Sequence, residues 1–136
     1  MSKISIYTDG GSRGNPGPAA IGVVVKENNK IIFQLGKTIG VATNNEAEYQ
    51  GLIEALKWLI EQKNKIDQID FFLDSKLVVF QMKGEYKVKA PKVIPLFAQA
   101  KQLEKQIDSK INYQHIRREL NSQADALLNQ ALDGLQ

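Results

Sequence analysis

Residues 7–17, YTDGGSRGNPG, decide the fold, because an apolar strand here runs into an aspartate followed by four glycines, an asparagine and a proline. Turns are rich in these residue types, so the simplest interpretation is a strand that ends in a turn. The alternative is that Asp9 stands at the end of the strand because it has a chemical role. The residues on either side of this stretch distinguish the two interpretations.

The strand that leads into this stretch is the first of three. Residues 3–9, KISIYTD, are followed by AAIGVVVKE (19–27) and KIIFQLGKTIG (30–40). The last two are joined at ENNK, which predicts a short hairpin turn. Connections this short favour an antiparallel meander.

The second half of the chain alternates helices with strands. Leu52, Ile53 and Leu56 recur at helical spacing, and Thr43 followed by Glu46 has the form of a capping box. This alternation predicts parallel strands joined by crossovers, and therefore an α/β fold with a mixed sheet. The expected elements are a helix over 44–63, a strand over 69–74, a helix over 75–82, a helix over 91–106 after Pro91, a strand over 111–117 and a helix over 121–132.

Composition narrows the class of protein. The 136 residues, 43% of them hydrophobic, are expected to form a single domain over 1–136. There is no cysteine, which excludes a disulfide framework and a thiolate metal site. There is no run of eighteen apolar residues and no apolar export signal at the start, so we expect a cytoplasmic protein with no membrane partner.

The positive charge is modest but uneven. The net charge is +3, and residues 82–92, MKGEYKVKAPK, hold four lysines against one glutamate. A smaller basic spot is formed by Arg117 and Arg118. Such a segment is either ordinary solvated surface or an edge that follows a phosphate backbone, and composition does not choose between them.

Four carboxylates lie at positions where ligands bind. Asp9 and Asp74 end two strands that read as parallel, and in open α/β sheets ligands bind at the carboxyl ends of strands. Asp74 is alternatively a simple helix cap in the pair Asp–Ser. Glu48 shares a helix face with Leu52, which is costly for a charge unless it is paired or metal-bound. The alternative for Glu48 is dipole stabilisation near the helix start, which by itself also explains Asp125.

Together these four acids suggest a metal site. None has a lysine or arginine as its immediate sequence neighbour, and we expect them to converge without basic partners. Like charges brought together repel, and hard divalent cations relieve that repulsion. An all-oxygen ligand set suits Mg²⁺ or Mn²⁺ rather than zinc.

The motifs in register resemble the type 1 ribonuclease H family, in its compact subgroup. They are YTDGGSRGNPGPAAIGVV, TNNEAEYQGLIEAL, LDSKLVV, GEYKVK and HIRRELNSQADALLNQAL, and they cover nearly the whole chain. The resemblance implies a five-stranded mixed sheet in the order 3-2-1-4-5 with helices on both faces. It also implies a monomeric endonuclease that hydrolyses the RNA strand of RNA–DNA hybrids and leaves 5′-phosphate and 3′-hydroxyl ends.

The resemblance also assigns roles to residues. It makes Asp9, Glu48, Asp74 and Asp125 the catalytic ligands of two Mg²⁺ ions, which Mn²⁺ would replace. It places substrate contacts in the glycine-rich loop and the helix start, where glycines would allow the backbone to approach the RNA strand and where Thr43 could also simply cap the helix. The predicted substrate-binding residues are Gly10, Gly11, Asn15, Thr43, Asn44, Asn45, Lys87, Lys89 and Arg118.

Two departures from the family pattern affect these expectations. Many members carry a long basic protrusion, of which only Tyr86, Lys87 and Lys89 remain here. Many also carry a histidine in a loop before the last helix, whereas His115 falls inside a predicted strand and Arg118 stands where the chain leaves it. We therefore expect His115 to be a packed or surface residue. A nuclease of the same fold acting on other nucleic acids and a non-catalytic binding module are the competing functions.

Overall fold

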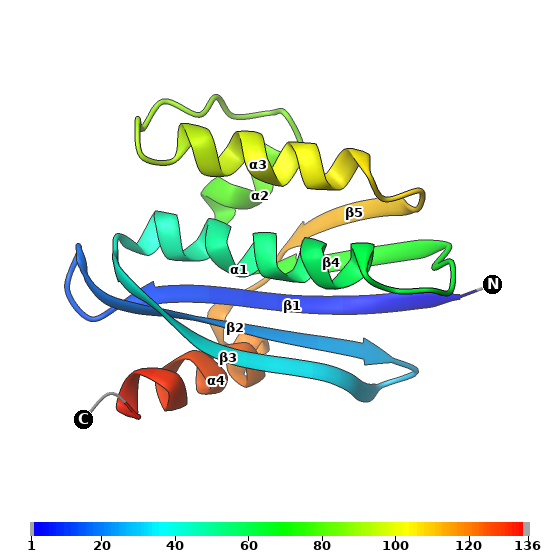
Figure 1. The fold of residues 1–136 in the computed structure, drawn as a ribbon, viewed down its shortest axis with the longest axis horizontal. Coiled ribbons are helices and arrows are strands. Elements are labelled where there is room, and N and C mark those ends of the chain that lie inside the picture. Colours follow the sequence, from blue (N-terminus) through cyan, green and yellow to red (C-terminus); the bar gives the residue numbers. More distant parts are fainter. Residues whose placement is uncertain (1, 135–136) are drawn as a thin grey trace.

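The computed structural model describes residues 2–134 and contains one five-stranded sheet in the order β3-β2-β1-β4-β5 (Figure 1). This is the predicted strand order. The strands are β1 (Lys3–Ser12), β2 (Gly17–Glu27), β3 (Lys30–Ala42), β4 (Gln68–Leu73) and β5 (Lys110–His115). The helices are α1 (Asn44–Ile60), α2 (Lys76–Met82), α3 (Ile94–Lys105) and α4 (Ser122–Asp133), with a 3₁₀ turn at Arg118–Asn121.

The two halves of the sheet have the predicted directions. The pairs β1–β2 and β2–β3 are antiparallel, whereas β1–β4 and β4–β5 are parallel. The turn between β2 and β3 places Asn28 and Asn29 at φ of 54° and 64°. Asparagine tolerates this left-handed conformation, which suits a tight hairpin between twisted strands.

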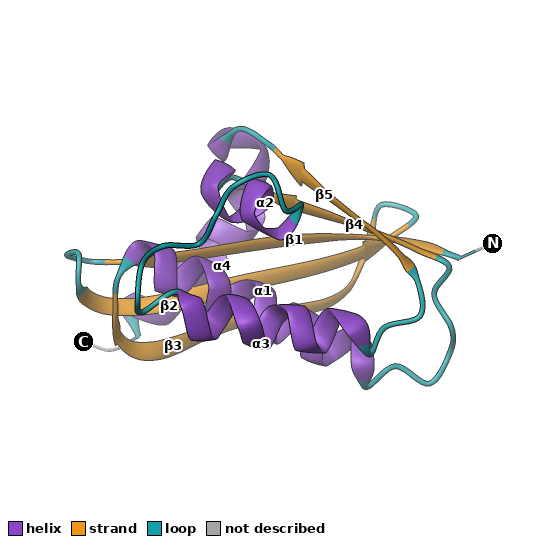
Figure 2. Cartoon of the chain, turned by 90° about the horizontal axis from the view of Figure 1, so that it is seen from above, coloured by secondary structure: helices purple, strands orange, loops and turns teal. Residues whose placement is uncertain are grey.

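Helices cover both faces of the sheet, as predicted. In Figures 1 and 2, α1, α2 and α3 lie on one face and α4 lies on the other. The main core lies under α1, where Ile6 and Phe71 of the sheet meet Leu52 and Leu56 of the helix, all of them buried. Among residues 2–134, no helix has both the length and the apolar character needed to cross a membrane.

Several element boundaries differ from the prediction. Strand β1 continues to Ser12, so Asp9 does not end it; pairing with β2 extends the strand as far as Ser12 opposite Ala19. Helix α3 begins at Ile94 rather than after Pro91, with Pro95 in its first turn, where a missing backbone N–H costs nothing. Helix α1 ends at Ile60 and β5 at His115, each earlier than expected.

Strand β3 forms one outer edge of the sheet. Ile31 and Ile32 near its start are about half exposed, at 44% and 50%, and Val41 near its end is 74% exposed. Its pairing with β2 is interrupted by two irregularities, between Ala19 and Ala20 and between Val25 and Lys26. These irregularities bend and twist the strand pair.

Candidate active site

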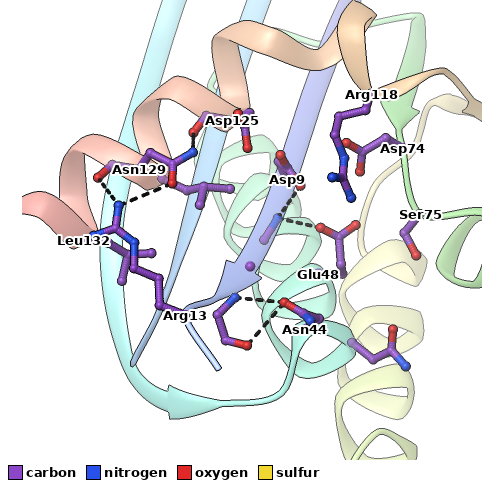
Figure 3. Close-up of a pocket in the computed structure, with 15 residues that line it drawn as sticks. Asp9, Arg13, Asn44, Glu48, Asp74, Ser75, Arg118, Asp125, Asn129 and Leu132 are labelled. Carbon is purple, nitrogen blue, oxygen red and sulfur yellow. Dashed lines mark hydrogen bonds between the residues drawn. The ribbon is translucent and has the colours of Figure 1, made fainter. Parts of the chain in front are cut away.

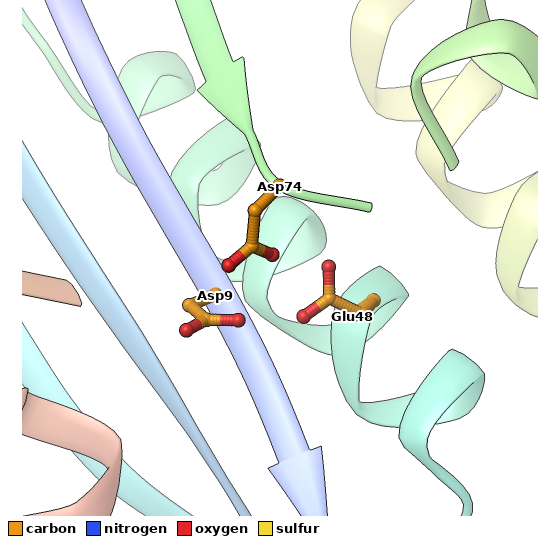
Figure 4. Close-up of side chains that lie close together, drawn as sticks. All are labelled: Asp9, Glu48 and Asp74. Carbon is orange, nitrogen blue, oxygen red and sulfur yellow. The ribbon is translucent and has the colours of Figure 1, made fainter. Parts of the chain in front are cut away.

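Strand register brings Asp9 and Asp74 together. The last residues paired between the parallel strands β1 and β4 are Thr8 and Leu73, so Asp9 is the next residue of β1 and Asp74 is the residue directly after β4. Parallel pairing ends there, although β1 itself continues along β2. Asp9, Glu48 and Asp74 each offer a carboxylate oxygen, and the three oxygens lie within 4.8 Å of one another (Figure 4).

Glu48 joins this group because α1 lies directly on β1. A Cβ atom at Gly10 would lie 2.2 Å from the backbone carbonyl carbon of Ala47, and one at Gly51 would lie 2.9 Å from the carbonyl oxygen of Asp9. No side chain fits at either point, so glycine is required for the close approach. The amide of Gly10 then donates to Asp9 Oδ1 at 2.9 Å and to Glu48 Oε1 at 2.6 Å (Figure 3).

The position of Gly10 changes the role expected for it. We predicted that glycines in this stretch allow the backbone to approach RNA. In the structure Gly10 is buried, and it leaves room for α1 instead. Its amide is already engaged by two carboxylates and is not a free donor for substrate.

Burial makes it unfavourable for the acids of the cluster to be ionised unless a cation balances their charge. Asp9 and Glu48 are only 6% and 7% exposed. The pKa of Asp9 is raised to about 6, chiefly by burial and also by the charge of Asp74, although contacts with Glu48 and the Gly10 amide oppose the rise. Burial also raises the pKa of Glu48 well above its usual range, with a contribution from the neighbouring Asp9. Two buried acids in contact cannot both ionise without compensation.

One carboxylate oxygen of the cluster gives direct evidence for a cation-binding site. Within the described residues, Glu48 Oε2 is buried and has no hydrogen-bond partner. A buried carboxylate oxygen left without a partner is costly, and a bound hard cation supplies the missing interaction. The donor set of three carboxylates therefore fits a divalent ion of the magnesium type.

Asp125 lies at the same pocket but outside the group of three. It projects from the first turn of α4 and is half-buried, and it lines a pocket of about 500 Å³ together with Asp9, Glu48 and Asp74 (Figure 3). Its charge contributes to the raised pKa values of Asp9 and Asp74, whose largest cause is burial. Three of the four predicted acids are thus brought together, and the fourth faces them across the pocket.

Helix α4 is held close to the sheet by two glycines. A Cβ atom at Gly22 would lie 2.0 Å from the carbonyl oxygen of Ala124, and one at Gly36 would lie 2.6 Å from that of Leu127. The buried side chain of Asn121 adds a bond to the central strand, from its Nδ2 to the Thr8 carbonyl at 2.9 Å. These contacts determine where Asp125 stands relative to Asp9.

Among the described residues, no lysine or arginine forms an ion pair with any of the four acids, but one positive charge lies near enough to affect Asp74. Arg118 lies in the 3₁₀ turn and lines the pocket on the side of Asp74 (Figure 3). Burial raises the pKa of Asp74, and the charge of Arg118 opposes that rise. We expected His115 to be a packed or surface residue; it is exposed at the end of β5 and does not line this pocket, so it is a surface residue.

The other predicted substrate residues fall into two places. Gly11, Asn44 and Asn45 line the pocket, and Thr43 forms the predicted capping box with Glu46. Asn15 Oδ1 accepts from the amide of Asn44 at 3.0 Å, so its side chain ties the glycine-rich loop to the start of α1. Lys87 and Lys89 lie on the exposed segment between α2 and α3, outside this pocket.

Sequence reasoning missed several residues at the site, including Asn121, Arg13 and Asn129. Asn121 anchors the last helix, and Arg13 and Asn129 line the pocket. Arg13 bridges to Asp133 of α4 at 2.7 Å. The sequence held only weak signals for these residues. Arg13 lies within the glycine-rich stretch 7–17, and Asn121 lies four residues before Asp125. Neither residue type at that position indicates a functional role.

Comparisons with known proteins agree with this geometry. Residues 7–131 match the family described as reverse transcriptase-like. The chain is 44% identical over 133 residues to a bifunctional protein of Mycobacterium tuberculosis and 41% identical over 132 residues to ribonuclease HI of Halobacterium salinarum, in each case over 96% of this chain. It also resembles the crystal structure of LC11-RNase H1 in complex with an RNA/DNA hybrid, with a TM-score of 0.92 and 41% identity over 97% of this chain and 98% of that one.

The relatives differ in length from this chain. It spans 36% of the mycobacterial protein and 65% of the halobacterial one.

Proposed function

The chain belongs to the type 1 ribonuclease H family, and on that premise we propose that it is a monomeric endonuclease that hydrolyses the RNA strand of RNA–DNA hybrids. The products would carry 5′-phosphate and 3′-hydroxyl ends. The observation that carries the proposal is the group of Asp9, Glu48 and Asp74, with one buried carboxylate oxygen left unpaired, at the carboxyl ends of parallel strands. The relative solved with an RNA/DNA hybrid supports the substrate.

The four acids would hold two Mg²⁺ ions, and Mn²⁺ would replace them. Asp9 would be shared by both ions, Glu48 and Asp74 would complete one ligand set, and Asp125 would complete the other across the pocket. When bound, such ions lower the pKa of water and stabilise the attacking and leaving oxygens of phosphoryl transfer.

The chain's own residues prepare the site for this chemistry. The Gly10 amide holds one oxygen each of Asp9 and Glu48, and among the described residues the second oxygen of Glu48 has no hydrogen-bond donor. Because α1 touches β1 through glycine backbone, the two carboxylates have little freedom to separate. Arg118 brings a positive charge beside Asp74, where it would attract the phosphate group that is cleaved or released.

The substrate would lie across the start of α1 and the segment after α2. Asn44 and Asn45 would contact the sugar–phosphate backbone in the pocket beside Gly11, with Asn15 and Thr43 next to them at the start of α1. Backbone contacts to the 2′-hydroxyl are how a protein distinguishes RNA from DNA. Lys87 and Lys89 would follow the phosphates of the second strand.

One experiment tests the proposal against both competitors. End-labelled RNA–DNA hybrid, duplex DNA and duplex RNA are incubated with the protein in Mg²⁺ or in EDTA, and the products are separated on a gel. We expect cleavage of the RNA strand of the hybrid only, and only with Mg²⁺. Cleavage of duplex DNA would identify another nuclease of this fold, and retention of the hybrid without cleavage would identify a binding module.

A further inference from the structure

Two hydrogen bonds through a buried glutamine connect α1, the helix that carries Glu48, to the basic segment, residues 82–92. Tyr49 of α1 donates from its hydroxyl to Gln81 Oε1 of α2 at 2.6 Å, and Gln81 Nε2 donates to the backbone carbonyl of Lys87 at 3.3 Å. Gln81 is 4% exposed and Tyr49 is fully buried. Tyr49 is the residue after Glu48, so the two hydrogen bonds run from a point on α1 next to the acid cluster to the backbone of the exposed Lys87.

The segment between α2 and α3 has few other anchors along its first half. The amides of Glu85 and Tyr86 both donate to the carbonyl of Phe80, and the Tyr86 ring lies 5.1 Å from the Phe80 ring. Val88 packs against the core. Between these two points, among the hydrogen bonds described for residues 2–134, the bond from Gln81 to Lys87 is the one that ties this stretch of backbone to α2.

From these contacts we propose that Gln81 is a positioning residue that presents Lys87 and Lys89 to the nucleic acid. The inference rests on the proposed function, because it assumes that these two lysines meet substrate. Gln81 touches no substrate and acts through the Lys87 backbone. A flexible basic segment would lose conformational entropy on binding, and a segment already held in place avoids most of that loss.

The amide side chain is the chemistry that this position requires. It must accept a hydrogen bond from a tyrosine hydroxyl on one side and donate one to a carbonyl on the other. Glutamate in its charged form accepts from Tyr49 but cannot donate to Lys87, and it would place a carboxylate against a carbonyl oxygen. Methionine has similar length and supplies neither bond.

The two hydrogen bonds of the Gln81 side chain can be separated by mutation. Gln81→Met removes both bonds, whereas Tyr49→Phe removes only the bond to α1 and leaves the bond to Lys87 intact. Tyr49→Phe is therefore the matched control for loss of packing and of a buried hydrogen bond. Both variants are checked by circular dichroism and by thermal melting before any other measurement.

The first readout does not depend on catalysis. Limited trypsin digestion cuts after lysine, so it reports local opening at Lys87 and Lys89. We expect Gln81→Met to accelerate cleavage at these two sites about two- to tenfold relative to other sites, the range expected for loss of one hydrogen bond. Tyr49→Phe should leave the cleavage rate at these sites unchanged.

The second readout is steady-state cleavage of a hybrid in Mg²⁺. We expect Gln81→Met to raise KM about two- to tenfold with little change in kcat, and Tyr49→Phe to leave KM unchanged. Equal effects of the two variants, or no effect of Gln81→Met on trypsin cleavage, would overturn the inference. If wild-type protein fails to cleave the hybrid, the proposed function fails instead, and the trypsin result still decides whether Gln81 anchors the segment.

Discussion

The acid cluster and the basic segment are the two regions that would meet nucleic acid, and they are built in opposite ways. The cluster stands on buried backbone that touches backbone, at Gly10 and Gly51, where no side chain fits. The basic segment is exposed and carries its lysines on a stretch of chain held by a few hydrogen bonds. The carboxylates proposed to catalyse the reaction are therefore fixed by tight packing of the backbone. The lysines proposed to bind substrate are held by a few local hydrogen bonds, whose loss would destabilise the fold only slightly.

The largest expected effect comes from breaking the acid cluster. Asp9→Asn, Glu48→Gln and Asp74→Asn should each lower kcat on a hybrid by about 10³-fold or more, because each removes a charge that the metal site needs. The measurement is single-turnover cleavage in Mg²⁺, with circular dichroism to confirm folding. If a folded variant keeps near wild-type activity, that acid has a structural role and the contrast with the basic segment is lost.

Replacing Arg118 should have the next largest effect, because its positive charge lies close to Asp74 in the acid cluster. We expect Arg118→Ala to lower kcat about tenfold or more, below the loss caused by the acids because its side chain is exposed. His115→Ala is the matched control, since His115 is exposed and lies outside the pocket, and it should change kcat by less than about tenfold. If His115→Ala lowers kcat strongly and Arg118→Ala does not, these two assignments are reversed.

The third prediction concerns stability without metal. The Asp9 pKa of about 6 lies above its ordinary value of about 4, so the folded protein binds the proton more tightly than the unfolded chain. Stability from this group is full below about pH 4 and is lost as the pH rises through about 6. In EDTA, Asp9→Asn should therefore be more stable than wild type at pH 7, by about 1–3 kcal/mol, and the advantage should disappear near pH 4.

Denaturant unfolding at several pH values measures this difference. Lys87→Ala serves as a control, because an exposed lysine far from the cluster should show no such pH dependence. An Asp9→Asn variant that is less stable than wild type at pH 7 would show that the cluster stabilises the fold rather than straining it.

The smallest effect is expected in the basic segment. Replacing Lys87 and Lys89 together by alanine should weaken binding to hybrids of any sequence and reduce the slope of log affinity against log salt by up to about one unit per lost contact. Titrations at several salt concentrations measure it, with a variant of the exposed Lys63, on the connection after α1, as control. If the slope does not change, the two lysines do not contact the nucleic acid and the segment is ordinary solvated surface.

Much of the fold could be predicted from sequence because its signals are local. The alternation of strand and helix patterns, the asparagine turn after residue 27 and the capping box at Thr43 each depend on neighbouring residues, and all three are present. The family motifs gave the strand order. The end of β1 and the start of α3 were predicted wrongly, because they depend on pairing with β2 and on the second proline, Pro95.

The site was only partly predictable for a related reason. Asp9 and Asp74 could be selected because the sequence predicts strand ends there, although β1 continues past Asp9, and Glu48 could be selected from its place on a helix face. The separate position of Asp125, the approach of Arg118 to Asp74 and the double use of the Gly10 amide depend on how helices sit on the sheet. That spacing is determined by contacts between residues far apart in sequence, such as Gly22 with Ala124.

The outer edge of β3 affects how the protein behaves at high concentration. A thirteen-residue strand with one free edge and exposed isoleucines is a template onto which a second chain could add, which is the usual first step of aggregation. The two irregularities in its pairing with β2 twist this edge, and the exposed Lys30 places positive charge at its start, whereas Lys37 is paired with Glu54 of α1 at 3.6 Å. The twist and the charge of Lys30 both discourage edge-to-edge addition, so Lys30 is a poor choice for removal when the protein is engineered.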